Sequence, residues 1–211
     1  MRAPKGSGSG FEIPDGSYGA VCIMVIDCGM QESNWDGNTT FKRQIYVRFE
    51  LPEVTIPDGE YAGKSAGIGQ RYTFSMHKKS NLRRDLQTWR GRPFTDAEAE
   101  GFDILSIVGR SCTLQVFMNE KGYNNINLIT PYSGSLAASE PILTFDTEDF
   151  VQAQFDALPD WIQKKINLPS AEDRQMASEY DDVQSRQYAR EQNDTAKTTG
   201  QMDDFDDDIP F

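Results

Sequence analysis

The sequence is poor in the residue types that most often carry catalysis. Its only histidine is His77, which excludes a two-histidine metal motif and leaves no triad partner for a nucleophile. The chain also lacks a Walker sequence and a complete dinucleotide-binding fingerprint. Three cysteines, Cys22, Cys28 and Cys112, form no paired framework, so we expect buried free thiols. We therefore predict a protein that is not an enzyme, with no metal site and no cofactor.

Long hydrophobic runs are absent as well. No apolar stretch approaches the roughly 18 residues of a membrane-spanning helix, and the first residues lack the apolar core of a signal peptide. Hydrophobic residues make up 37% of the chain, and the mean hydropathy is −0.60. We expect a protein of the cytoplasm without a membrane partner, in which part of the chain has no packed core.

Charge is unevenly distributed along the 211 residues. The net charge is −12, but residues 171–211 hold 12 acidic and 4 basic residues, while the remainder holds 21 acidic and 17 basic residues. The body is close to neutral, so the overall acidity does not exclude a nucleic-acid ligand. We predict a flexible leader at 1–10, a folded domain at 11–168, a disordered linker at 169–202 and an acidic tail at 203–211.

Alternation of apolar and polar residues predicts five strands, at 17–27, 41–51, 70–76, 111–119 and 123–130. The first is apolar on both faces, which is typical of an interior strand. Residues 29–40, with Trp35, are expected to form a long hairpin loop, and residues 52–69 a second loop. In the second strand, the predicted core residues are Phe41, Ile45, Val47, Phe49 and Leu51, and the predicted solvent-facing residues are Lys42, Gln44, Tyr46, Arg48 and Glu50.

A longer and a short helix are predicted between the third and fourth strands. Ser80 can cap a helix over 81–90 that ends at Gly91, and Thr95 with Glu98 matches a capping box for a short second helix. Three strands, a helix and two strands is the element order of a five-stranded OB-fold barrel. A β-sandwich is the alternative, but it would not normally place a helix in mid-chain. The predicted fold is therefore mainly β, an OB-fold barrel with a few helices.

An amphipathic pattern follows the last strand. Phe150, Val151, Phe155 and Leu158 share one stripe over 147–158, and a further helical turn covers 161–166. These segments are too apolar to remain in solvent. We expect them to pack on the barrel or on a second copy of the chain, which makes a homodimer possible.

Positive charge gathers in the middle of the chain. Residues 64–92 contain eight Lys or Arg and one acid, Asp85, and such a surface can neutralise phosphates. Exposed aromatic rings beside it would stack on unpaired bases. An ordinary solvated helix face is the alternative for the arginines at 83, 84 and 90. The predicted DNA-binding residues are Trp35, Lys42, Tyr46, Arg48, Arg71, Lys78, Lys79, Arg83, Arg84 and Tyr123.

The last nine residues combine aspartates with an apolar end. Such a segment suits a partner with a hydrophobic pocket rimmed by Lys or Arg, although a solubilising tail is the simpler interpretation. The sequence resembles the terminal peptide of bacterial single-stranded DNA-binding proteins, which recruits replication and repair enzymes. The matching residues, which we predict to bind partners, are Asp206, Asp207, Asp208, Ile209, Pro210 and Phe211.

The body has a resemblance of its own. The segments 72–76 (YTFSM), 80–83 (SNLR), 86–95 (LQTWRGRPFT) and 158–166 (LPDWIQKKI) are similar to a family of tailed-bacteriophage proteins regarded as single-stranded DNA-binding proteins. The resemblance covers most of residues 11–166 and implies an OB fold, a place in phage DNA replication, recombination or repair, and the cytoplasm of a bacterial host. Many members lack the acidic terminal peptide, so its presence departs from the usual pattern.

Two functions are consistent with these features. The first is sequence-independent binding and protection of single-stranded DNA, with the tail recruiting replication, repair or recombination enzymes. The second is a non-enzymatic adaptor or inhibitor, whose tail imitates that of the host protein and sequesters its partners. The basic stretch at 64–92 favours the first.

Overall fold

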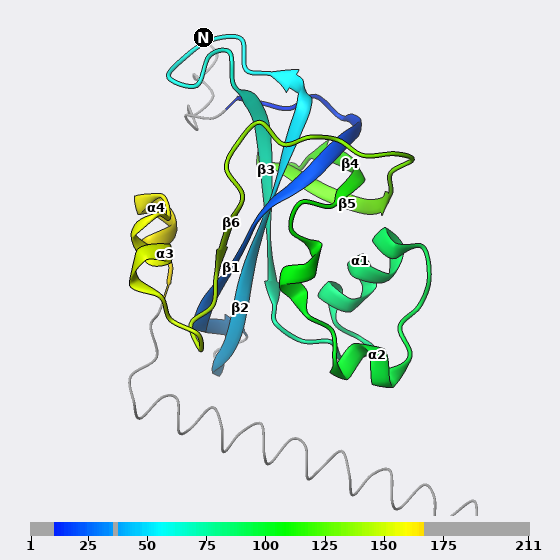
Figure 1. Ribbon diagram of the computed structural model, residues 1–211, viewed down its shortest axis with the longest axis vertical. Coiled ribbons are helices and arrows are strands. Elements are labelled where there is room, and N and C mark those ends of the chain that lie inside the picture. The colour runs from blue at the N-terminus through cyan, green and yellow to red at the C-terminus, as the bar shows by residue number, and fades with distance from the viewer. Residues whose placement is uncertain (1–10, 36–37, 167–211) are drawn as a thin grey trace, which may run out of the picture. The chain divides into compact units, whose positions relative to one another are not determined.

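The computed structural model describes residues 11–35 and 38–166 (Figure 1). The predicted leader, linker and acidic tail lie outside these residues and stay predictions. The described strands are β1 (Gly16–Trp35), β2 (Asn38–Thr55), β3 (Ser65–Thr73), β4 (Ser111–Met118), β5 (Asn124–Pro131) and β6 (Leu143–Phe145). The described helices are α1 (Asn81–Arg90), α2 (Asp96–Glu100), α3 (Gln152–Asp156) and α4 (Asp160–Gln163), with a 3₁₀ turn η1 (Ile104–Ile107).

The described strands form one sheet. Their order is β3-β2-β1-β4-β5 with antiparallel neighbours, and β6 adds a short parallel pairing to β1. The mainly β fold is therefore confirmed. Within the described residues no ladder joins β3 to β5, so the closed barrel stays a prediction.

Strand β1 is the centre of the sheet, as its two apolar faces predict. It pairs with β2 along one edge, and along the other it pairs first with β4 and then with β6. The register shifts between Cys22 and Met24, so the strict alternation of faces is broken there. Cys22 and Val25 consequently belong to one core cluster, while Ile23 and Met24 belong to the other.

Helix α1 has the predicted ends. The Ser80 side chain accepts a hydrogen bond from the Arg83 amide, and Gly91 ends the helix with a positive φ of 73°. The capping box of α2, formed by Thr95 and Glu98, is also present. Helix α1 packs on one side of the sheet, which we call the inner face, where the ring centroids of Trp89 and Phe49 are 5.6 Å apart.

The opposite side of the sheet, which we call the outer face, is covered by later residues. Residues 132–166, the C-terminal strap, lead from β5 past β6 to α3 and α4, which lie on the opposite side of the sheet from α1 (Figure 1). Strap residues Phe145, Leu158, Ile162 and Ile166 pack against β1 in a second core. Burying each of these side chains contributes roughly 1.5–3 kcal/mol. The packing of the amphipathic segment on the sheet is therefore confirmed for Phe155 and Leu158, whereas Phe150 and Val151 are 42% and 40% exposed.

Two predicted loops are wrong. Residues 29–35 and 38–40 continue β1 and β2, with Trp35 paired to Asn38, because long twisted strands tolerate the polar residues beyond the core. Strand β3 begins at Ser65, inside the predicted loop 52–69, and ends at Thr73. Its first residues include Gly67 and Gly69, which fall within the predicted loop. Phe41, predicted to face the core, is 62% exposed because it lies beyond the sheet's packed centre.

The strap also differs from the prediction. The helix predicted over 147–158 is only α3, because Thr147 and Glu148 are committed to hydrogen bonds with the sheet. Strand β6 was missed, since three residues are too few for an alternating pattern. All three cysteines are buried and free, as predicted, and burial raises the pKa of Cys22 to about 12.

The described part of the chain contains neither a membrane-spanning helix nor a cluster of metal-ligating side chains. None of its helices is long and apolar enough to cross a membrane. Its His, Cys, Asp and Glu side chains nowhere gather in threes as a metal ion requires.

Candidate nucleic-acid interface

The strap is fastened to the outer face at Glu50. This carboxylate is fully buried in β2, although we predicted that it faces solvent. It accepts hydrogen bonds from the amides of Ser139, at 3.0 Å, and Glu140, at 3.1 Å, and from the Ser139 hydroxyl. Burial alone would raise the pKa of Glu50, but these hydrogen bonds outweigh burial and lower it. The carboxylate is therefore a structural anchor.

A second fastening, which we call the clasp, lies further along β1 and β2. Its residues are Asp27, Arg43, Asp146, Thr147 and Glu148. The Arg43 guanidinium pairs with Asp27 at 2.9 Å and also with Asp146 and Glu148 of the strap. The Thr147 amide and hydroxyl both donate to Asp27. Burial opposes ionisation of Asp27, yet its partners hold the pKa below the ordinary value.

Between these fastenings, β2 and β3 present an aromatic and cationic surface. Tyr46 lies directly opposite Arg71 in the β2–β3 ladder, and Arg71 is exposed. The Tyr46 ring leans across β3 above Gly69, where a Cβ atom would lie 1.8 Å from the tyrosine oxygen. Glycine at this position is therefore what lets the ring lie flat on the sheet.

Arg48 repeats this arrangement one pair along the ladder. A Cβ atom on Gly67 would lie 2.7 Å from the Arg48 guanidinium, so the guanidinium also crosses β3 above a glycine. Its ion pair with Glu140 is long, at 3.7 Å, and its Nε atom is buried without a hydrogen-bond partner among the described residues. Arg48 is thus held by packing more than by its carboxylate partner.

Helix α4 adds a second ring that the sequence interpretation missed. Trp161 is 38% exposed and meets Tyr46 edge to face, with ring centroids 5.5 Å apart. The Lys165 ammonium lies 4.9 Å from the centre of the Trp161 ring. The available signal was the spacing of Trp161 and Lys165, which places a ring and a cation one helical turn apart.

We call Tyr46, Arg48, Arg71, Trp161 and Lys165 the outer cluster. It brings together three of the predicted DNA-binding residues and two that were not predicted. Its surroundings are cationic. The positive charges of Arg48 and Arg71 act to lower the pKa of the Tyr46 hydroxyl, and those of Arg71 and Lys165 act to lower the pKa of the Cys28 thiol. Burial nevertheless raises the pKa of Tyr46, so its hydroxyl is neutral at ordinary pH.

The other predicted residues do not join the outer cluster. Lys42, Lys79 and Tyr123 are exposed, and Tyr123 lies at the β4–β5 turn. Trp35 ends β1, and its side chain falls outside the described structure. Arg83 is buried, and its guanidinium donates to the carbonyl oxygens of Met76 and Phe94. It therefore supports α1 and is not available to a ligand.

The cations of residues 64–92, predicted to form one phosphate-neutralising surface, are divided between the two sides of the sheet. Helix α1 and its flanks lie on the inner face, away from Tyr46. Carboxylates neutralise most of the cations there: Lys78 and Arg83 pair with Asp96, Arg84 with Asp85, and Arg90 and Arg92 with Glu98. The charge count missed this because Asp96 and Glu98 fall just beyond the counted stretch.

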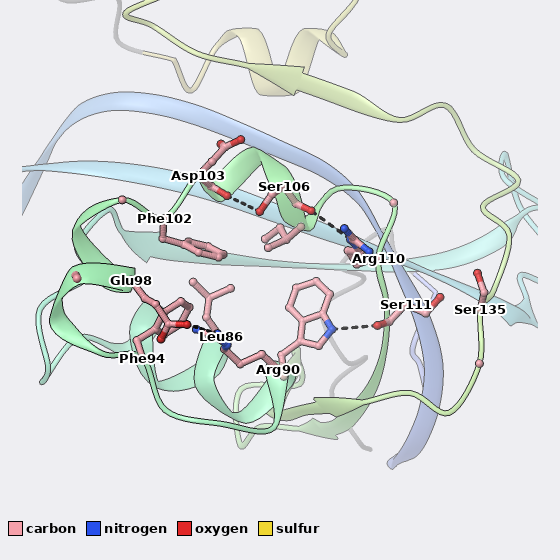
Figure 2. Close-up of a pocket in the computed structure, with 16 residues that line it drawn as sticks. Leu86, Arg90, Phe94, Glu98, Phe102, Asp103, Ser106, Arg110, Ser111 and Ser135 are labelled. Carbon is pink, nitrogen blue, oxygen red and sulfur yellow. Dashed lines mark hydrogen bonds and ion pairs between the residues drawn. The ribbon is translucent and has the colours of Figure 1, made fainter.

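The inner side also carries a hollow of about 780 Å³, between α1, α2, η1 and residues 134–135 (Figure 2). Its apolar lining includes Leu86, Trp89, Phe94, Phe102 and Ile107. At the rim, the Arg90 guanidinium pairs with Glu98 and lies 4.1 Å from the centre of the Phe94 ring. Since the rim holds equal numbers of Arg and acidic residues, this hollow offers no excess positive charge to a phosphate chain.

Comparisons with protein families, curated proteins and solved structures find no match for this chain. The similarity to phage single-stranded DNA-binding proteins therefore stays a prediction, as does the tail peptide, which lies outside the described residues.

Proposed function

We propose that the protein binds single-stranded DNA without sequence preference, through the outer cluster. The observation that carries this proposal is the meeting of two partly accessible rings, Tyr46 and Trp161, with three cations on one face of the sheet. Only one carboxylate, Glu140, pairs with these cations among the described residues.

The chemistry of the cluster suits unpaired nucleotides. An unpaired base exposes faces that stack on aromatic rings, and each such contact contributes roughly 1–3 kcal/mol. Arg71 and Lys165 flank the rings and can neutralise backbone phosphates, which adds affinity for any sequence and makes binding salt-dependent. Duplex DNA keeps its base faces stacked inside the helix, so it would use only the cations.

The strand order supports an OB fold for the proposed function. Strands β1, β2 and β3 form a meander, α1 follows β3, and β4 pairs with β1. This arrangement is compatible with a five-stranded, partly open barrel, and β2 with β3 is the usual ligand face of that fold. We further propose that the protein serves phage DNA replication, recombination or repair, where residues 203–211 recruit partner enzymes.

The direct test is titration of the full chain with oligo(dT) at two salt concentrations, followed by tryptophan fluorescence. We expect saturable quenching that weakens as salt rises, because stacking reaches Trp161 and phosphate contacts release counterions. A duplex of equal length should bind at least about tenfold more weakly, by the loss of one stacked base. Absence of a saturable, salt-dependent signal with oligo(dT) would contradict the proposal.

A matched pair of variants assigns the binding to the outer face. Arg71→Ala should weaken binding and reduce the slope of log affinity against log salt by about one, because it removes one phosphate contact. Arg84→Ala is the control, since Arg84 is equally a surface arginine but lies on α1 beside Asp85. Equal losses of affinity in both variants would show that the DNA binds at another surface.

A further inference from the structure

The outer cluster is made of two parts that are far apart in the sequence. Tyr46, Arg48 and Arg71 stand on β2 and β3, whereas Trp161 and Lys165 belong to the strap. The rings of Tyr46 and Trp161 meet only because the strap lies on the sheet. Within α4, Ile162 is buried against β1, but α4 is a four-residue helix without a side-chain cap.

The clasp is the nearer to α4 of the two polar fastenings that come before it in the strap. Its strap residues, 146–148, lie between β6 and α3, and Asp27 with Arg43 holds them from the sheet. Thr147 is 7% exposed and Asp27 is 5% exposed, so the pair is well shielded from water. After the clasp, the strap is held by apolar packing of Leu158, Ile162 and Ile166, and by a hydrogen bond from Gln31 to the Lys165 carbonyl.

Apolar packing alone is not directional, whereas a hydrogen bond fixes orientation. The clasp supplies that direction at the start of the α3–α4 segment. If it opens, Leu158 and Ile162 can still be buried, and the directional contact that remains near Trp161 is the hydrogen bond from Gln31 to the Lys165 carbonyl.

We propose that the clasp positions Trp161, so that single-stranded DNA binds tightly only when the strap is fastened. Asp27, Arg43 and Thr147 are positioning residues that do not touch the DNA themselves. The inference rests on the proposed function of the outer cluster. A ligand that contacts both parts stabilises their association, so bound DNA must in turn hold the strap on the sheet.

The test uses Thr147→Val in the full chain, which removes the hydroxyl that donates to Asp27 and keeps the side-chain shape. We expect about a 3- to 10-fold loss of oligo(dT) affinity, because a smaller fraction of molecules has the fastened strap. The control is Thr88→Val on α1, which removes a hydroxyl that donates to the Arg84 and Asp85 carbonyls on the inner side. It should leave the affinity unchanged.

A double-mutant cycle separates positioning from general loss of structure. In a Trp161→Ala background, Thr147→Val should cause no further loss, because the ring that it positions is already absent. Amide exchange over residues 143–166 should slow when oligo(dT) is added to the unmodified chain. If Thr147→Val fails to fold, Glu148→Gln weakens the same clasp from its exposed side.

The outcomes distinguish the inference from the proposed function. Loss of affinity in Trp161→Ala, with none in Thr147→Val, would overturn the clasp and leave the outer cluster as the DNA site. An equal loss from Thr147→Val in both backgrounds, or exchange unchanged by oligo(dT), would also overturn it. Absence of oligo(dT) binding by the unmodified chain would remove the proposed function and the inference together.

Discussion

The two sides of the sheet use positive charge differently. On the inner side, five of the Lys and Arg residues around α1 pair with three carboxylates, and Arg83 is buried in the process. On the outer side, Arg71 and Lys165 form no ion pair within the described residues and stand beside aromatic rings. Most of the inner cations therefore tie α1 and its flanks to α2, whereas Arg71 and Lys165 on the outer side are available to a ligand.

Trp89 and Trp161, which lie on opposite sides of the sheet, follow the same division. Trp89 is 9% exposed on the inner side, and its ring nitrogen donates to the Ser111 carbonyl at 3.0 Å. Trp161 is 38% exposed on the outer side, and its described contacts are with the Tyr46 ring and the Lys165 ammonium. The comparison predicts a stability role for one ring and a binding role for the other.

The largest expected effect is on the inner side. Trp89→Ala should lower the free energy of unfolding by about 3–5 kcal/mol, because it leaves a cavity beside Phe49 and an unsatisfied carbonyl. Urea denaturation followed by circular dichroism measures this. Trp161→Ala should cost about 1–2 kcal/mol in the same experiment, since it loses only ring and cation contacts at the surface. Equal losses would show that the two sides do not divide in this way.

Much of the fold was predictable from local patterns. The alternation in β4 and in the centre of β2 and the caps of α1 are short-range signals, and the structure confirms them. In β5 the alternation misleads, because Leu128 is 40% exposed and Ile129 is buried beside a register shift. The continuation of β1 and β2 into the predicted hairpin loop was not predictable in this way, because residues 29–35 are mostly polar and are held by strand pairing. Similarly, Glu50 was predicted to face solvent from its position in the alternation. Its burial depends on Ser139, which lies 89 residues away.

The candidate site was predictable in part, for the same reason. Tyr46, Arg48 and Arg71 follow from alternation on two neighbouring strands. Trp161 could be placed beside Tyr46 only by knowing that the strap crosses the outer face. Arg83 was misjudged because a count of cations along the chain contains no information about which carboxylates lie near them in space.

The next effect concerns binding. Trp161→Ala should weaken oligo(dT) binding by about 10- to 100-fold, because it removes one stacked base. Trp161→Phe keeps an aromatic face and should recover most of the affinity, which a purely structural role of the indole would not predict. Fluorescence anisotropy of labelled oligo(dT) measures both variants. A wild-type affinity for Trp161→Ala would place the stacking ring elsewhere.

A smaller effect is expected from the glycine beneath Tyr46. Gly69→Ala would place a Cβ atom within 1.8 Å of the tyrosine oxygen, so the ring must leave its flat position on β3. We expect a loss of about 1–3 kcal/mol in unfolding free energy together with weaker oligo(dT) binding. Gly101→Ala is the control, because its nearest contact would be 3.7 Å and it lies after α2 on the inner side. A Gly69→Ala variant with unchanged affinity would show that the position of the Tyr46 ring does not matter for binding.

The smallest effect should appear only at acid pH. The pKa values of Asp27 and Glu50 are lowered in the folded chain from ordinary values of 3.8 and 4.5, so folding favours their ionised forms. Their contribution is complete above those ordinary values and is lost as the pH falls through the lower, folded-state pKa values. Urea denaturation between about pH 6 and pH 3 should therefore show a fall in stability that is flatter in Glu50→Gln. Asp58→Asn, at an exposed loop residue, is the control variant for this comparison. Because both carboxylates fasten the strap, the same acid titration should release Trp161 from Tyr46 before the inner core unfolds. Trp161 fluorescence that changes only with global unfolding would contradict this order.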